Sequence, residues 1–287
     1  MSEAAGSPLT LAEAVPLGTV AVQRLLTSWG VRSLAYKGPA FAVLGVRRPR
    51  VSNDIDLLIH PDDRDRATAA LTGAGWTRVW LSFPAAVDDI AYSTTVSHPR
   101  FPATVDSHHW VKGALAWPTA FDTMWEQRAR VVVAHVEVCT PSAEHALVLE
   151  FLNAQKGVPP DQWGAKAQAV ISGGTSLDVD VDAVAEAASS LGARETAAAL
   201  IVGLGGAPLT RTPTLAFQDW LDARDRPADW AIFIRLLQRV PHELPRWLWR
   251  RITFGDDVAR NWARVQGLPY KGVAHVLLLR LKRGRSR

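Results

Sequence analysis

The stretch Asp54-Ile55-Asp56-Leu57-Leu58-Ile59 predicts a buried β-strand that carries two carboxylates. Residues i and i+2 of a strand project from the same face, so Asp54 and Asp56 converge. Like charges at such short range repel unless a cation lies between them. A hard divalent ion with oxygen ligands, Mg²⁺ above all, is the usual cation at such a pair. Asp-x-Asp also occurs on solvated strand edges, and the apolar continuation Leu57–Ile59 is what favours a metal site here.

A Lys37-Gly38 pair follows a short expected strand at 31–36 and marks a strand-to-helix turn. Free N–H groups at the start of a helix bind phosphate, glycine lets the backbone approach the anion, and Lys37 adds a positive charge. Arg50 lies four residues before the acidic strand, within reach of a phosphate held by the metal. The neighbouring Arg47 and Arg48 either share that role or are solvated.

A third acidic residue, Asp106, lies in a β-rich segment that could pair beside the strand of Asp54 and Asp56. Three carboxylates there would complete a two-metal site for in-line phosphoryl or nucleotidyl transfer. His108 and His109 follow closely and suggest zinc, but consecutive strand residues face opposite sides, so both cannot easily serve one ion. A structural role is the simpler interpretation of this histidine pair.

The hydrophobic pattern predicts an α/β (α+β) fold with a mixed sheet, followed by a helical C-terminal part. A helix is expected over 10–30, either continuous or split at Pro16, and another over 62–74. Further strands or hairpins are expected at 76–81, 90–97, 104–110 and 131–138, and helices at 142–155, 163–171, 181–191 and 194–204. We place the domain boundary near residue 140, with a catalytic domain at 1–140 and a helical domain with a basic tail at 141–287.

Composition excludes an intrinsically disordered chain, because 48% of the 287 residues are apolar. The net charge of +4 is mild and lies largely in the last 17 residues, which include six basic ones. We expect 280–287 to form a flexible, solvated end. The single cysteine, Cys139, excludes an intramolecular disulfide and is expected to be buried on a strand. With neither a signal peptide nor an apolar run long enough for a bilayer, the expected location is cytoplasmic and no membrane partner is expected.

Taken in order, these motifs resemble the uncharacterised nucleotidyltransferase family of the polymerase-β-like superfamily. The resemblance is specific over about residues 20–112 and looser to about residue 208. It departs from the wider superfamily at the turn, where Lys37-Gly38 replaces the usual Gly-Ser, and a histidine-rich helix found in many family members is missing from the helical part. The matching residues are Lys37, Gly38, Arg50, Asp54, Ile55, Asp56, Leu57, Leu58, Gly75, Trp76 and Asp106.

The resemblance implies a polymerase-β-like core that transfers NMP from an NTP to a hydroxyl or phosphate of an acceptor and releases pyrophosphate. Asp54, Asp56 and Asp106 would be the catalytic residues and the ligands of Mg²⁺ or Mn²⁺. Lys37, Gly38 and Arg50 would bind the NTP co-substrate, for which ATP is one candidate. A small molecule or peptide is the favoured acceptor.

Several rival functions remain open from the sequence. One is a sugar-phosphate or other phosphoryl transferase on the same fold, and another is a toxin-like enzyme acting on tRNA or other RNA, for which the basic C-terminus is the only indication. A third is a non-catalytic, NTP-binding regulator. A metal-dependent glycosyltransferase is disfavoured, because only 53 residues precede the acidic strand and its nucleotide-sugar domain would need more.

Overall fold

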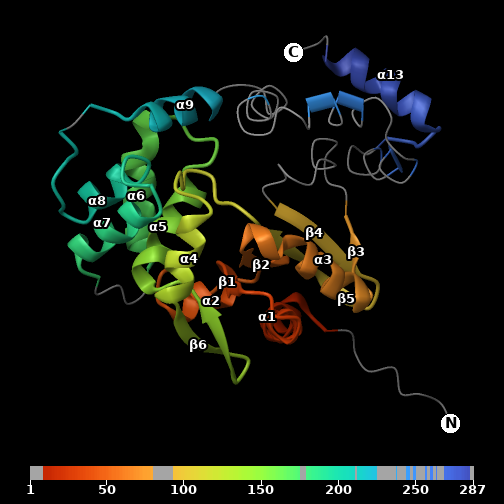
Figure 1. Cartoon of the computed structure of the whole chain (residues 1–287), viewed down its shortest axis with the longest axis horizontal. Coiled ribbons are helices and arrows are strands. Elements are labelled where there is room, and N and C mark those ends of the chain that lie inside the picture. The colour runs from red at the N-terminus through yellow and green to blue at the C-terminus, as the bar shows by residue number, and fades with distance from the viewer. Residues whose placement is uncertain are drawn as a thin grey trace.

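The computed structural model of the chain (Figure 1) describes residues 9–79, 93–174, 179–210, 212–224 and 268–284, with isolated helical residues between 237 and 263. The expected strand at 76–81 is seen as β3, and the expected strand at 90–97 begins outside these ranges. None of the described helices has the length and apolar character that crossing a membrane requires.

A five-stranded mixed sheet forms the core of the N-terminal half, in the order β1-β2-β5-β4-β3. Only β2 and β5 run parallel; every other neighbouring pair is antiparallel. The mixed sheet and the α/β class expected from the sequence are therefore confirmed. The strands are β1 (Ser33–Ala35), β2 (Asp54–Ile59), β3 (Thr77–Arg78), β4 (Ser93–His98) and β5 (Phe101–His108).

Alternation along β2 divides its side chains between two apolar layers. Ile55, Leu57 and Ile59 pack with α1 (Leu11–Ser28) and α3 (Arg64–Gly73). A short 3₁₀ turn at Pro61–Asp63 connects β2 to α3. Leu58 faces the other way and packs into the core of the helical half. Gly18 lets α1 approach closely, because a β-carbon there would lie 2.4 Å from Cδ1 of Ile55. The face of β2 that carries Leu58 also carries Asp54 and Asp56.

Helix α1 runs unbroken through Pro16, so the alternative of a helix split there does not apply. Proline removes one backbone hydrogen bond and costs about 3 kcal/mol inside a helix. Burial of the apolar face outweighs that cost, since Val15, Val22 and Leu26 are almost fully buried. The carboxylate of Glu13 also closes the helix start by accepting from the backbone N–H of Thr10 at 2.9 Å.

β6 (Ala129–Val133) and β7 (Val136–Thr140) form a separate hairpin. Of the two alternatives expected at 131–138, a strand or a hairpin, the hairpin is therefore the one observed. Gln23 of α1 ties this hairpin to β1: its amide nitrogen donates to the carbonyls of Ser33 and Cys139, and its amide oxygen accepts from the Cys139 N–H. Cys139 itself is half-buried, less covered than expected. An unexpected helix, α4 (Thr119–Glu126), precedes the hairpin.

The second half is helical, as expected, and its core is continuous with one face of the sheet. Leu34 and Leu58 of the sheet belong to the same apolar cluster as Phe151 and Leu200 of the helical half, so no solvent layer separates the two halves. Figure 1 shows these helices gathered beside the sheet. They are α5 (Ala143–Ala154), α6 (Trp163–Gly173) after a 3₁₀ turn at Pro160–Gln162, α7 (Val181–Ser190), α8 (Ala198–Gly203) and α9 (Leu215–Arg224).

The chain's last described helix, α13 (Val273–Gly284), includes most of the segment expected to be a flexible tail. The backbone of 280–284 is helical and continues from Val276 and Leu277, which pack in a small apolar cluster. Residues 285–287 lie outside the described part.

His145 links α5 to α7 in the helical half and makes stability depend on pH. Its ring contacts the Ser142 hydroxyl through Nδ1 at 2.9 Å and the Ser190 hydroxyl through Nε2 at 3.1 Å. Burial lowers the pKa of His145 to about 4, a shift that Glu144 only partly opposes. The folded state therefore holds the ring neutral, and its contribution is complete above the unfolded pKa of about 6.5 and lost as the pH falls towards 4.

We expect His145→Gln to destabilise the protein at pH 7.5 and to lose most of that effect near pH 4. The difference in unfolding free energy between wild type and variant should shrink by about 1.4 kcal/mol per pH unit across this window. Urea unfolding of both proteins at several pH values measures it. A difference that stays constant with pH would contradict the assignment.

Candidate active site

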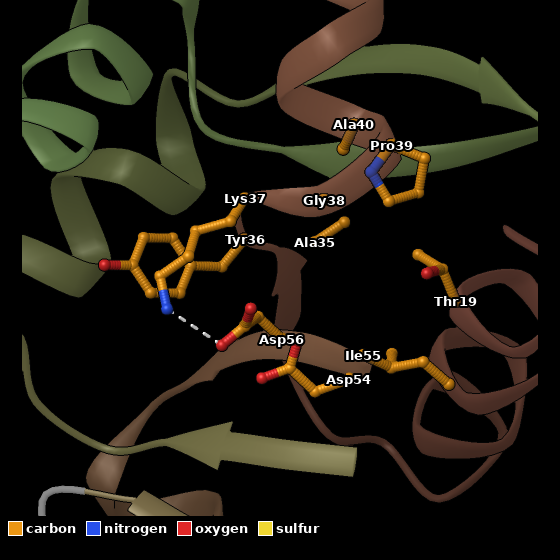
Figure 2. A pocket seen from close by; sticks show the side chains of 10 residues that line it. All are labelled: Thr19, Ala35, Tyr36, Lys37, Gly38, Pro39, Ala40, Asp54, Ile55 and Asp56. Carbon is orange, nitrogen blue, oxygen red and sulfur yellow. Dashed lines mark hydrogen bonds and ion pairs between the residues drawn. The ribbon is translucent and has the colours of Figure 1, made fainter. Parts of the chain in front are cut away.

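Two of the three expected acidic residues lie opposite each other on neighbouring parallel strands. Asp56 of β2 is in register with Asp106 of β5, and Asp54 is in register with Thr104 two residues earlier. Side chains two residues apart share a face, and Figure 2 shows the Asp54 and Asp56 carboxylates on the same side of β2. Strand pairing thus brings Asp106 to the acidic pair across a sequence separation of 50 residues.

The Asp56 carboxylate is buried and receives two hydrogen bonds on the same oxygen. Lys37 Nζ lies 2.9 Å from Oδ1, as the dashed line in Figure 2 marks, and His108 Nε2 lies 2.6 Å from it. Burial by itself would raise the pKa of Asp56, but the hydrogen bond from His108 and the charge of Lys37 hold the pKa below its usual value. The ammonium of Lys37 is therefore one positive charge in contact with the acidic pair.

Asp106 and Asp54 have different surroundings from Asp56. The hydroxyl of Thr95 on β4 donates to Asp106 Oδ1 at 2.5 Å, and burial raises the pKa of Asp106, with the negative charges of Asp56 and Asp54 adding to the rise. Asp54 is half-buried and accepts from the Ser52 hydroxyl at 2.6 Å. The ionised form of Asp106 is therefore the costly one at this site.

Ligand atoms of Asp56, Asp106 and His108 lie within 4.8 Å of one another, the spacing of a metal-binding group. Across the described ranges this is the one such group, and Asp54 lies outside it. The donor set fits a divalent cation, because the buried carboxylate of Asp56 and the half-buried carboxylate of Asp106 converge and offer hard oxygen ligands.

The expected separation of the two histidines is confirmed, and only His108 lies at the acidic site. His108 faces Asp56, whereas His109 faces Thr94 on the other side of the sheet, with 3.2 Å between its Nε2 and the Thr94 hydroxyl. Burial lowers the pKa of His109 to about 3, so this ring stays neutral. The alternation of β5 explains why only one of the pair enters the site.

The turn at Lys37-Gly38 has an unusual backbone. Lys37 adopts φ 60° and ψ −145°, a region that costs a non-glycine residue of the order of 1–3 kcal/mol, and Gly38 follows at φ 47°. A β-carbon at Gly38 would meet nothing within 4 Å, so the turn faces open space. The following helix α2 (Gly38–Val43) is a short one. A shallow hollow beside it is lined by Thr19, Ala35, Tyr36, Lys37, Gly38, Pro39, Ala40, Asp54, Ile55 and Asp56 (Figure 2).

The arginines before β2 divide into exposed and buried ones. Arg50 is exposed, and so is Arg48. Arg47 is buried, and its guanidinium lies 3.7 Å from the carboxylate of Glu150 on α5. This ion pair links the loop before β2 to the helical half. Neither of the two roles expected for Arg47 describes this contact.

Lys156, just after α5, is a site residue that the sequence reasoning missed. Burial, with smaller effects of the charges of Lys37 and Lys112, lowers the pKa of Lys156 to about 8, and the charges of Asp56 and Asp106 partly oppose this shift. Its Nζ donates to Asn153 Oδ1 at 2.9 Å. Glu150, Asn153 and Lys156 follow one another at intervals of three along α5 and the turn after it, a spacing that could have pointed to Lys156.

Residues 17–156 match the family model of the uncharacterised nucleotidyltransferases. The match covers just under half of the chain and agrees with the resemblance that its motifs carry, and it indicates an enzyme of the nucleotidyltransferase class. No curated protein sequence matches the chain significantly.

Three solved structures are similar to the chain at low identity. The antibiotic-resistance factor ANT(2'')-Ia is 14% identical over 69% of this chain and 97% of its own, with a TM-score of 0.39. The lincosamide antibiotic adenylyltransferase LnuA is 14% identical over 47% and 82%, with a TM-score of 0.32. A nucleotidyltransferase-like antigenic protein of Paracoccidioides brasiliensis is 16% identical over 71% and 98%, with a TM-score of 0.39.

Proposed function

We propose that the protein transfers NMP from an NTP to a hydroxyl or phosphate of a small molecule or peptide, with Mg²⁺ or Mn²⁺. The observation that carries this proposal is the meeting of Asp56 and Asp106 on adjacent parallel strands, with Asp54 on the same face and Lys37 against Asp56. The family match supports the reaction class.

Asp54, Asp56 and Asp106 are the proposed metal ligands. When bound, the metal would offset negative charge at the reacting phosphate and the departing pyrophosphate. The protein contributes position and charge more than covalent chemistry. Asp106 would either hold a second metal ion or accept the proton of the attacking hydroxyl, and its raised pKa suits it to accept a proton.

Lys37 and Gly38 are the proposed triphosphate site. Gly38 leaves its backbone open to an approaching phosphate, and the ammonium of Lys37 can turn from Asp56 to a phosphate because its four-carbon stem is flexible. Lys156 adds positive charge from the helical half. These groups would balance the charge of a triphosphate beside three carboxylates.

Arg50 is the proposed outer phosphate contact. Its exposure leaves it able to reach a bound nucleotide, and Arg50→Ala should weaken NTP binding by about 1–3 kcal/mol, the range for a charge-assisted hydrogen bond. Calorimetric titration measures the change. Arg48→Ala is the matched control, since Arg48 is also exposed on the same loop, and equal losses in both variants would reduce Arg50 to a general charge effect.

Pyrophosphate release tests the function directly. Each NTP is offered with Mg²⁺ and a panel of hydroxyl-bearing small molecules, peptides and RNA, and products are weighed by mass spectrometry. An acceptor heavier by one NMP supports the proposal. Transfer of a phosphoryl or sugar-phosphate group, RNA as the only acceptor, or NTP binding without pyrophosphate release would each replace it with the corresponding rival.

A further inference from the structure

We propose that His108 is a positioning residue of the metal site, which donates a hydrogen bond from Nε2 to Oδ1 of Asp56 and fixes the direction of that carboxylate. The inference rests on the proposed function, in which Asp56 is a metal ligand. His108 would thus act on the metal through Asp56 rather than by direct coordination.

The position of His108 on β5 brings its ring close to the carboxylate of Asp56. His108 follows Asp106 by two residues on β5, so both side chains project from one face, and it is in register with Leu58 of β2. The ring is 1% exposed and its Nε2 lies 2.6 Å from Asp56 Oδ1. A buried contact this short restricts rotation of the carboxylate.

The ring of His108 is held from its other side by Tyr36. Their ring centroids are 5.1 Å apart in an edge-to-face arrangement, and Tyr36 is itself 2% exposed. The Lys37 ammonium lies 4.4 Å from the centroid of the Tyr36 ring and 2.9 Å from Asp56. Tyr36, Lys37, Asp56 and His108 therefore form a closed set of contacts around one carboxylate oxygen.

The hydrogen-bond roles follow from the charge of Asp56. A carboxylate can only accept, so the Nε2 atom of His108 that faces it carries the proton and donates. A nitrogen that carries a proton has no lone pair for a metal. His108 thus completes the Asp56–Asp106 group as an orienting donor, with the second oxygen of Asp56 as the one that the metal would use.

Removal of such an orienting hydrogen bond weakens metal binding by about 10- to 100-fold in other sites. We expect this loss for Mn²⁺ in His108→Leu, which keeps an apolar side chain in the buried space and removes the donor. His108→Gln retains an N–H donor of similar reach and should recover most of the affinity. His109→Leu is the matched control: a neighbouring buried histidine on the opposite face, whose loss should leave Mn²⁺ affinity unchanged.

Titration of the full chain with Mn²⁺ alone, followed by the electron paramagnetic resonance of the free ion, measures these affinities, and thermal melting checks each fold. Pulsed electron paramagnetic resonance of the wild type adds a readout that needs no variant, because a directly bound ¹⁴N gives a characteristic coupling and none is expected. Wild-type affinity in folded His108→Leu, or direct ¹⁴N coupling, would overturn the inference and leave the proposed function standing. A wild type that binds no Mn²⁺ would overturn both.

Discussion

Asp106→Asn is expected to lower the rate of nucleotidyl transfer about a thousandfold and to leave the fold at least as stable as the wild type. Loss of a metal ligand or proton acceptor costs several kcal/mol of activation energy. The Asn side chain can still accept from Thr95, whose hydroxyl lies 2.5 Å from the present carboxylate. Burial raises the pKa of Asp106, so its ionised form costs stability at neutral pH and the cost fades as the pH falls through that pKa.

Asp56→Asn should also lose the reaction but should melt several degrees lower. Asp56 is the partner of Lys37 and His108, and removing the charge leaves a largely buried ammonium without its carboxylate. Steady-state turnover and thermal melting of both variants measure the contrast, with Asp65→Asn on the exposed side of α3 as the control for the substitution itself. Full activity in Asp106→Asn would remove Asp106 from the site, and equal melting of the two variants would contradict the role of the Lys37 pair.

Gly38→Val is expected to abolish measurable NTP binding, a loss of about 100-fold or more. The branched side chain would occupy the open space in front of the turn and keep phosphate from the backbone, at a cost equal to about two charge-assisted hydrogen bonds. It also strains the backbone, because φ at Gly38 is 47°. A control must therefore separate strain from blocked access.

Gly30→Val is that control. Gly30 has a similar φ of 67°, and a β-carbon there would meet only the Arg66 guanidinium at 3.7 Å, an ordinary contact. Gly30 precedes β1, whereas Gly38 follows it, so the two lie at opposite ends of the strand. Titration with NTP should give wild-type affinity for folded Gly30→Val and none for folded Gly38→Val. Equal affinity in both would place the triphosphate elsewhere.

The acidic strand shows how far a local pattern determines this site. The alternation of Asp54-Ile55-Asp56-Leu57-Leu58 fixes which side chains share a face, because the side-chain period of a strand is two residues. This alternation predicted the paired carboxylates and the buried strand, and together with the Lys37-Gly38 turn it indicated the family. The same two-residue period, applied to the segment of Asp106, predicted the opposite directions of His108 and His109.

Contacts between residues far apart in the sequence could not be predicted from a local pattern. Whether Asp106 meets Asp56 depends on the choice and register of the paired strand, and that choice is made by the packing of the whole sheet. The contact between the Lys37 ammonium and Asp56 likewise results from tertiary structure. So does the effect of the Asp56 and Asp106 charges on Lys156 of the helical half.

The sequence by itself thus determined the elements whose signals lie within a few residues: the strand, the turn, most helices and the residue types of the site. Only the tertiary structure decided that α1 continues through Pro16 and that one apolar cluster extends from the sheet into the helical half. It also decided that His108 contacts Asp56, and that Asp54 lies outside the group formed by Asp56, Asp106 and His108. The physical reason is that periodicity and turn chemistry act along the chain, whereas burial and charge pairing depend on which distant segments pack together.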